Sequence, residues 1–147
     1  MRKYCEECKK EVETKVVTKK ETYDVCGEAI EVDAKVLICE ECGEEFYYEE
    51  FDNATLIQAY NEYRRKHKLL FPEEIKKIRE QYGLSQRSFA KLLNWGDKTI
   101  CRYENGSIQD KAHNSLLLFL RRPENMKTYL AENEILLDEK QKKKLMN

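Results

Sequence analysis

The sequence is poor in proline and glycine and has no long apolar segment. Its 147 residues include two Pro and five Gly, which excludes a collagen-like or low-complexity chain. The longest apolar run is Leu116–Leu120, and crossing a bilayer takes roughly 20 residues. Met1 to Cys5 contain no apolar stretch after the positive charges, so we expect no signal peptide. We therefore expect a cytoplasmic protein that does not contact a membrane and forms one ordinary domain or two small ones.

The usual residue patterns of a catalytic site are missing as well. The two histidines, His67 and His113, are isolated in the sequence. We find no paired histidine and carboxylate, no phosphate-binding glycine loop and no nucleophile signature. The sequence therefore predicts a protein that is not an enzyme.

Charge is divided unevenly along the chain, although the formal net charge is only −1. Residues 1–53 hold 8 Lys/Arg and 16 Asp/Glu, a net charge of −8, whereas residues 54–147 hold 19 and 12, a net charge of +7. The basic part suits a polyanion and the acidic part suits a basic protein. The alternative is that both are only solvated surfaces.

Four of the six cysteines form two Cys-x2-Cys pairs, Cys5 with Cys8 and Cys39 with Cys42. Thirty residues separate the pairs, and much of that segment is β-branched or alternates apolar and charged residues. This pattern predicts a long β-hairpin with both cysteine pairs at its base. Four thiolates satisfy tetrahedral Zn²⁺, and Gly43 suits the tight turn after the second pair.

Other uses of four cysteines fit the sequence less well. Disulfides need an oxidising compartment, and a redox-active Cys-x2-Cys usually accompanies a βαβ pattern. An iron–sulfur cluster also takes four cysteines. We favour structural Zn²⁺, which leaves no open position for catalysis and holds together a β unit with a thin core. Cys26 and Cys101 have no partner at ligand spacing and are interpreted as free thiols.

From Asn53 the apolar spacing becomes helical, which predicts a helix to about Lys68. Further helices are expected between Pro72 and Gly83, after the N-cap Ser85, and over residues 98–104, then after Asp110, from Pro123 to about Asn133, and in the Lys-rich tail from Asp138. The predicted fold is α+β with two domains. A zinc-binding β-hairpin domain (1–52) and a helical connector (53–70) precede an all-α helix-turn-helix domain with a helical extension (71–147).

The motif from Ile75 to Gly106 resembles the Cro/repressor-like helix-turn-helix family. The resemblance covers about residues 72–120 and rests on Ile75, Ile78, Arg79, Leu84-Ser85-Gln86, Phe89-Ala90, Leu92-Leu93, Ile100 and Arg102 to Gly106. In such a unit the helix 98–104 lies in the major groove of double-stranded DNA. Asp97, Lys98, Thr99 and Arg102 are the predicted base-reading residues; Gln86 is expected to contact phosphate or adenine, and Ser85 to bind phosphate. Arg79 and Glu104 are interpreted as a structural ion pair.

The combination of a cysteine unit and this helix-turn-helix resembles the MqsA/YgiT-type zinc-finger antitoxins. The resemblance rests on Cys5, Cys8, Cys39 and Cys42 together with the motif residues, and reaches about Arg122. It implies a zinc unit that binds a toxin, typically an RNA-cleaving one, and a homodimeric DNA-binding domain that represses its own operon at a palindrome. In that family an Asn and an Arg read bases; Arg102 matches the Arg, but Lys98 replaces the Asn, so a different operator is expected.

A second interpretation uses the same two-part layout. Transcription factors of mobile elements with no known partner toxin share it, so the chain could be a stand-alone regulator of the same helix-turn-helix family whose zinc unit binds something else. A gene for a small basic toxin beside this one would separate the two hypotheses.

Overall fold

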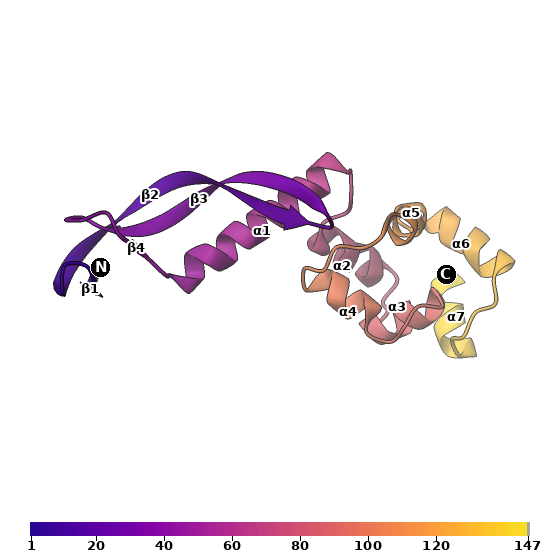
Figure 1. Cartoon of the computed structure of the whole chain (residues 1–147). Helices are drawn as coiled ribbons and strands as arrows, with labels where there is room; N and C mark the ends of the chain where they lie inside the picture. The colour runs from indigo at the N-terminus through magenta and orange to yellow at the C-terminus, as the bar shows by residue number, and fades with distance from the viewer. Residues whose placement is uncertain (147) are drawn as a thin grey trace. The chain divides into compact units, whose positions relative to one another are not determined.

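The computed structural model describes residues 1–146 and divides into two compact units, residues 1–66 and residues from 67 onward (Figure 1). The first unit contains an antiparallel sheet and one helix, and the second is helical. The predicted α+β class is confirmed. Among the described residues, no helix combines the length and apolar character needed to cross a membrane.

The sheet of the first unit has the order β1–β2–β3–β4, formed by Arg2–Cys5, Lys10–Val25, Glu28–Cys39 and Glu45–Phe46. The predicted hairpin is β2–β3, whose register runs from Thr14 opposite Cys39 to Val25 opposite Glu28. Cys26 and Gly27 form its two-residue turn with φ of 52° and 82°. Two positive φ angles are what a type I′ turn requires, and its twist matches that of the strands.

Helix α1, Glu49–Lys66, contacts β3 and β2 and belongs to the same unit as the hairpin. It buries Thr55 and Ala59, while β3 buries alternate residues such as Ile30, Val32 and Ala34. The helix begins four residues before the Asn53 expected from sequence. The reason is local, since the N–H groups of Phe51 and Asp52 already bond to the Tyr48 carbonyl.

The second unit consists of α2 (Pro72–Gln81), α3 (Gln86–Leu92), α4 (Thr99–Glu104), α5 (Lys111–Leu120), α6 (Pro123–Glu132) and α7 (Glu139–Met146). One apolar cluster joins them, with Ile75, Phe89, Leu92, Ile100, Leu117 and Leu120 fully buried. Burial of this kind stabilises a short helix far more than its intrinsic propensity does.

Three predicted helix ends are confirmed by their hydrogen bonds and dihedrals. The Ser85 hydroxyl accepts from Ser88 N–H, and the Asp110 carboxylate accepts from His113 N–H, as N-caps do. Gly83 follows α2 with a φ of 65°, the left-handed conformation that ends a helix. Helix α4 starts at Thr99, one residue later than expected, with Lys98 in the N-cap position.

Candidate metal centre and nucleic-acid interface

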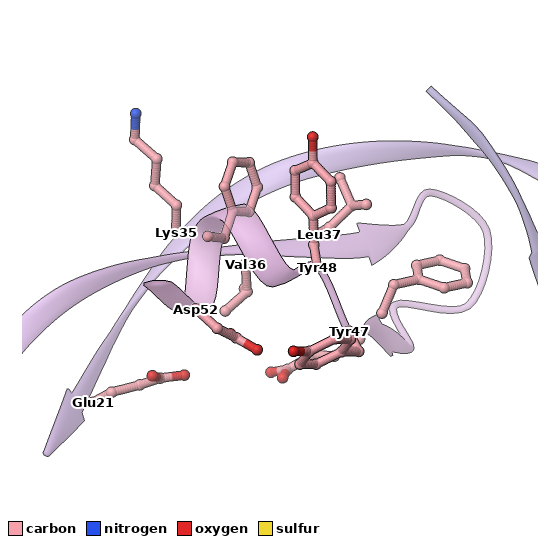
Figure 2. Close-up of a pocket in the computed structure, with 10 residues that line it drawn as sticks. Glu21, Lys35, Val36, Leu37, Tyr47, Tyr48 and Asp52 are labelled. Carbon is pink, nitrogen blue, oxygen red and sulfur yellow. The ribbon is translucent and has the colours of Figure 1, made fainter. Parts of the chain in front are cut away.

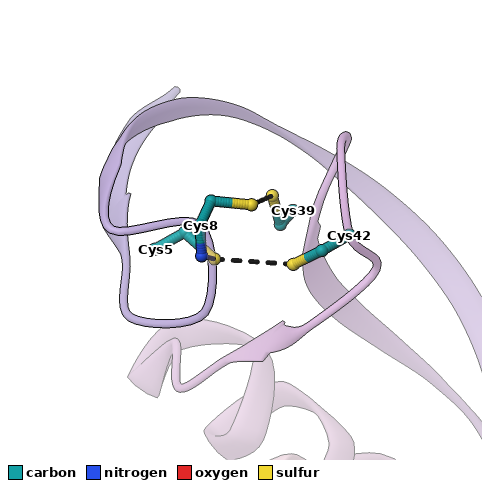
Figure 3. A group of neighbouring side chains, drawn as sticks. All are labelled: Cys5, Cys8, Cys39 and Cys42. Atoms are coloured by element: carbon teal, nitrogen blue, oxygen red, sulfur yellow. Dashed lines mark hydrogen bonds between the residues drawn. The ribbon is translucent and has the colours of Figure 1, made fainter.

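The sheet brings the four predicted cysteine ligands to one place (Figure 3). Cys5 ends β1 opposite Lys10, and Cys39 ends β3 opposite Thr14, so both cysteines lie near the beginning of β2. Cys8 and Cys42 lie in the turns that follow. The two turns are alike, because Lys9 N–H bonds to the Cys5 carbonyl and Gly43 N–H bonds to the Cys39 carbonyl, with φ of 58° and 80° at these residues. Two equivalent turns therefore present one cysteine pair each.

The spacing of the sulfur atoms suits a tetrahedral metal ion. All four lie within 4.8 Å of one another; Cys5 Sγ is 3.5 Å from Cys42 Sγ, and Cys8 Sγ is 3.9 Å from Cys39 Sγ. A tetrahedron with metal–sulfur bonds of about 2.3 Å has edges of about 3.8 Å. Cys5 and Cys39 are fully buried, and Val12 and Phe46 pack against the pair. The donor set and its geometry can therefore hold one ion.

The metal-free thiols differ in acidity. Backbone N–H groups of Cys42 and Glu41 donate to the Cys39 sulfur, and they lower the pKa of Cys39 to about 7. Hydrogen bonding to Cys42 and burial raise the pKa of Cys8 to about 12, and the pKa of Cys42 is raised as well. N–H groups aimed at one sulfur favour the thiolate, which is the metal-binding form.

Cys26 and Cys101 lie outside this cluster. Cys26 is exposed in the β2–β3 turn, and Cys101 accepts a hydrogen bond from the Asn105 side chain at 3.3 Å within α4. Both are free thiols, as expected from their spacing.

The predicted base-reading residues lie on α4 and the turn before it. Asp97, Lys98 and Arg102 are exposed, and Thr99 is half-buried at the first position of the helix. The Asp97 carboxylate lies 3.5 Å from the Arg87 guanidinium. The opposite side of α4 carries Ile100, which is fully buried. The helix therefore presents its polar residues outward.

The two predicted residues at the start of α3 have local partners. Ser85 is exposed and caps the helix, so its interpretation as an N-cap is confirmed. Gln86 donates through Nε2 to Glu104 Oε1 at 3.1 Å and thereby links α3 to the end of α4. Glu104 also receives the Arg79 guanidinium, which confirms the expected structural ion pair.

An aromatic cluster behind α4 was not anticipated from the sequence. The His113 ring stacks on Trp95 with centroids 3.8 Å apart, and its Nδ1 lies 2.7 Å from the Tyr103 hydroxyl. Trp95 is thus packed on the core beside the turn. The sequence pattern predicts no role for His113. The only signals for this cluster in the sequence are the aromatic residues themselves, Tyr103 on the predicted helix 98–104 and Trp95 in the turn before it.

A groove on the first unit lies between β3, β4 and the start of α1 (Figure 2). Its aromatic lining is Phe46, Tyr47, Tyr48 and Phe51, and its charged lining is Glu21, Glu45, Asp52 and Lys35. Tyr47 is 75% exposed. Lys19 is 2.5 Å from Glu45 and 3.6 Å from Glu21, whereas Asp52 forms no ion pair with the described residues. The groove combines exposed aromatic rings with acidic groups.

Comparison with known proteins agrees with this layout. Residues 3–130 match the family model described as the antitoxin component of bacterial toxin-antitoxin system, MqsA. The match includes the four cysteines, α1 and the helices up to most of α6. No curated protein matches the chain. The resemblance to MqsA-type antitoxins inferred from the sequence is confirmed by the family match.

Proposed function

The chain belongs to the MqsA antitoxin family, and on that premise we propose that it neutralises a toxin protein and represses transcription of its own operon. Both roles are binding roles, and neither requires catalysis by this chain. The acidic first unit would bind the toxin, and the basic second unit would bind DNA. The division of charge supports this assignment, because the negative unit would attract a basic toxin and the positive unit would attract the DNA phosphates.

The ion in the cysteine centre is proposed to be structural Zn²⁺. Four sulfur ligands leave no position for water or substrate, so the ion would hold the ends of β1 and β3 together. The N–H groups aimed at Cys39 help to keep that sulfur anionic. The first unit buries little besides the hairpin face and this centre, and a bound ion therefore contributes directly to its folding.

The observation that carries the DNA proposal is the short helix α4, which exposes Arg102 and follows the exposed N-cap residue Lys98. Its last residue, Glu104, is held by Arg79. Arg can address guanine O6 and N7 with two hydrogen bonds, and Asp97, Lys98 and Thr99 would face neighbouring bases. Ser85 and Gln86 would lie near a phosphate. We propose that a homodimer places two such helices about 34 Å apart on a palindrome. The exposed Leu118 and Phe119 on α5 are candidates for apolar contact between copies.

The groove beside Tyr47 is the surface that we propose for the toxin. An RNA-cleaving toxin needs a positively charged face for its substrate, and Asp52 and Glu21 would attract it. Exposed tyrosines are frequent anchors of protein interfaces. Asp52→Lys should weaken toxin binding, and Glu31→Lys, on β3 outside the groove, is the matched control. Equal toxin affinity in both variants would exclude the groove.

The DNA role is tested by titrating the full chain into the duplex upstream of its own reading frame at several salt concentrations. Affinity should fall steeply as salt increases, because phosphate neutralisation releases counterions. A flat salt response would contradict DNA binding by the basic unit. The alternative of a stand-alone regulator predicts the same titration result but no toxin partner. Only the measurement of toxin binding distinguishes it from the antitoxin proposal.

A further inference from the structure

Helix α7 lies beyond residue 130, where the family match ends, yet it is packed into the core of the second unit (Figure 1). Leu137 and Leu145 are each 7% exposed and belong to the same apolar cluster as Phe89 and Ile100. The Asp138 carboxylate caps the helix by accepting from Gln141 N–H at 2.8 Å. The helix expected in the Lys-rich tail is therefore capped and packed against this core.

Two hydrogen bonds join α7 to its neighbours, one to α3 and one to the segment between α2 and α3. The Gln141 amide donates to Ser88 Oγ at 3.0 Å, and the Lys144 ammonium donates to the Gly83 carbonyl at 3.2 Å. Gly83 permits this approach, because a Cβ there would lie 2.8 Å from Lys144 Nζ. The helix therefore contacts Gly83 and Ser88, which lie on either side of Ser85 in the sequence.

The outward side of α7 is strongly basic. The helix holds Glu139 and four lysines, Lys140, Lys142, Lys143 and Lys144, a net charge of +3 in eight residues. Lys142 is near Glu139 at 3.7 Å. Lys140 precedes Lys144 by four residues, so the two lie on the same flank of the helix, which is the flank that meets Gly83. Both are exposed.

We propose that Lys140 and Lys144 bind backbone phosphates of the same DNA duplex that α4 enters, and that they extend the contact made near Ser85 and Gln86. The inference rests on the proposed DNA binding of the second unit. Its support is charge complementarity at a defined place. Because α7 is packed on the core beside the α2–α3 turn, its lysines add phosphate contacts without ordering a flexible tail. Such contacts strengthen binding to any sequence and carry no base preference.

The test is the salt dependence of binding by the full chain to a 30-base-pair duplex of mixed sequence. Each phosphate contact contributes a slope of about 0.9 in log affinity against log salt, so Lys140→Gln/Lys144→Gln should reduce the slope by about 2. Because Lys144 also bonds to Gly83, Lys140→Gln alone is the second variant, with an expected reduction of about 1. Lys15→Gln/Lys127→Gln removes the same charge from exposed lysines of β2 and α6 and should leave the slope unchanged.

Unchanged slopes in both α7 variants, or an equal reduction in the β2/α6 control, would overturn the proposal while leaving DNA binding by α4 intact. A wild-type chain that shows no salt-dependent binding would overturn the DNA function and this inference together. The contact would be established if Lys140→Gln reduces the slope without changing thermal unfolding of the second unit, while Lys140→Arg, which keeps the charge, has the wild-type slope.

Discussion

The Arg79 guanidinium donates two hydrogen bonds to the Glu104 carboxylate, from Nε to Oε2 at 2.8 Å and from Nη2 to Oε1 at 3.0 Å. The side chains are only 13% and 5% exposed, and Arg79 also donates to the Leu84 carbonyl at 2.9 Å. This pair ties the first helix of the motif to the last residue of α4. The direction in which α4 presents Arg102 therefore depends on two residues that need not touch DNA.

Replacing Glu104 by Gln should destabilise the second unit by about 3 kcal/mol, because the nearly buried guanidinium would lose its countercharge. Glutamine also leaves only one acceptor oxygen for the hydrogen bonds that Arg79 and Gln86 now make to two. Denaturant unfolding followed by helical circular dichroism measures it. Glu80→Gln, at an exposed pair with Lys76, should change stability by less than about 0.5 kcal/mol. Equal stability of both variants would contradict a structural role for the Arg79–Glu104 pair.

A buried polar network holds the segment that precedes α2. Asn114 Oδ1 accepts from Leu70 N–H at 2.9 Å and from Gln109 Nε2 at 3.0 Å. Asn114→Ala should cost about 2 kcal/mol, since two buried donors would lose their acceptor. Asn114→Asp keeps the acceptor and should cost less in acidic buffer, where the buried carboxyl is protonated and uncharged. The urea midpoints of the two variants show whether the acceptor oxygen stabilises the unit. An alanine variant as stable as wild type would contradict this role and would show that water replaces the amide.

Metal binding should weaken as the pH falls. In the metal-free protein the pKa values of Cys8 and Cys42 are raised, so both thiols carry protons near neutral pH and must release them to bind the ion. With at least two protons displaced, affinity should fall by at least about 100-fold per pH unit between pH 8 and 7. Below pH 7, protonation of Cys39 adds to the loss. Competition with a chromophoric chelator measures the dependence, and a flat profile would contradict binding by these thiols.

Arg102→Ala should weaken binding to the operator by about 1–3 kcal/mol and relax the preference at one base position. Lys111→Ala, at the exposed start of α5, is a matched loss of charge outside α4. Binding to a panel of single-base operator variants shows whether Arg102 reads a base or contacts a phosphate. If Arg102→Ala weakens binding to every duplex equally, the residue contacts phosphate and does not read a base.

The strong signals in the sequence were those with local causes. Cysteine spacing predicted the sulfur cluster, and Ser85, Asp110 and Gly83 predicted helix ends, because caps and turns depend on a few neighbouring residues. Packing between distant segments was not predictable in this way. The network around Asn114 and the stack of His113 on Trp95 join residues far apart in the sequence, and isolated polar residues give no period to detect.

Helix α1 and helix α7 show the same limit. The sequence predicts both as helices but does not predict that α1 packs on the sheet or that α7 packs on the core of the second unit. A helical period indicates which residues share a side and not which element covers that side. The short strands β1 and β4 were missed because Arg2–Cys5 and Glu45–Phe46 are too short to show alternation. Their pairing is dictated by the cysteine turns.

The most direct test of the antitoxin role is the growth of cells induced to express the reading frame beside this gene, with and without this chain. We predict that the neighbour alone arrests growth and that the wild-type chain relieves the arrest. Arg102→Ala should relieve it equally well, because the first unit binds the toxin, whereas Cys39→Ser should fail. Absence of arrest, or relief by the cysteine variant as strong as by wild type, would contradict the account.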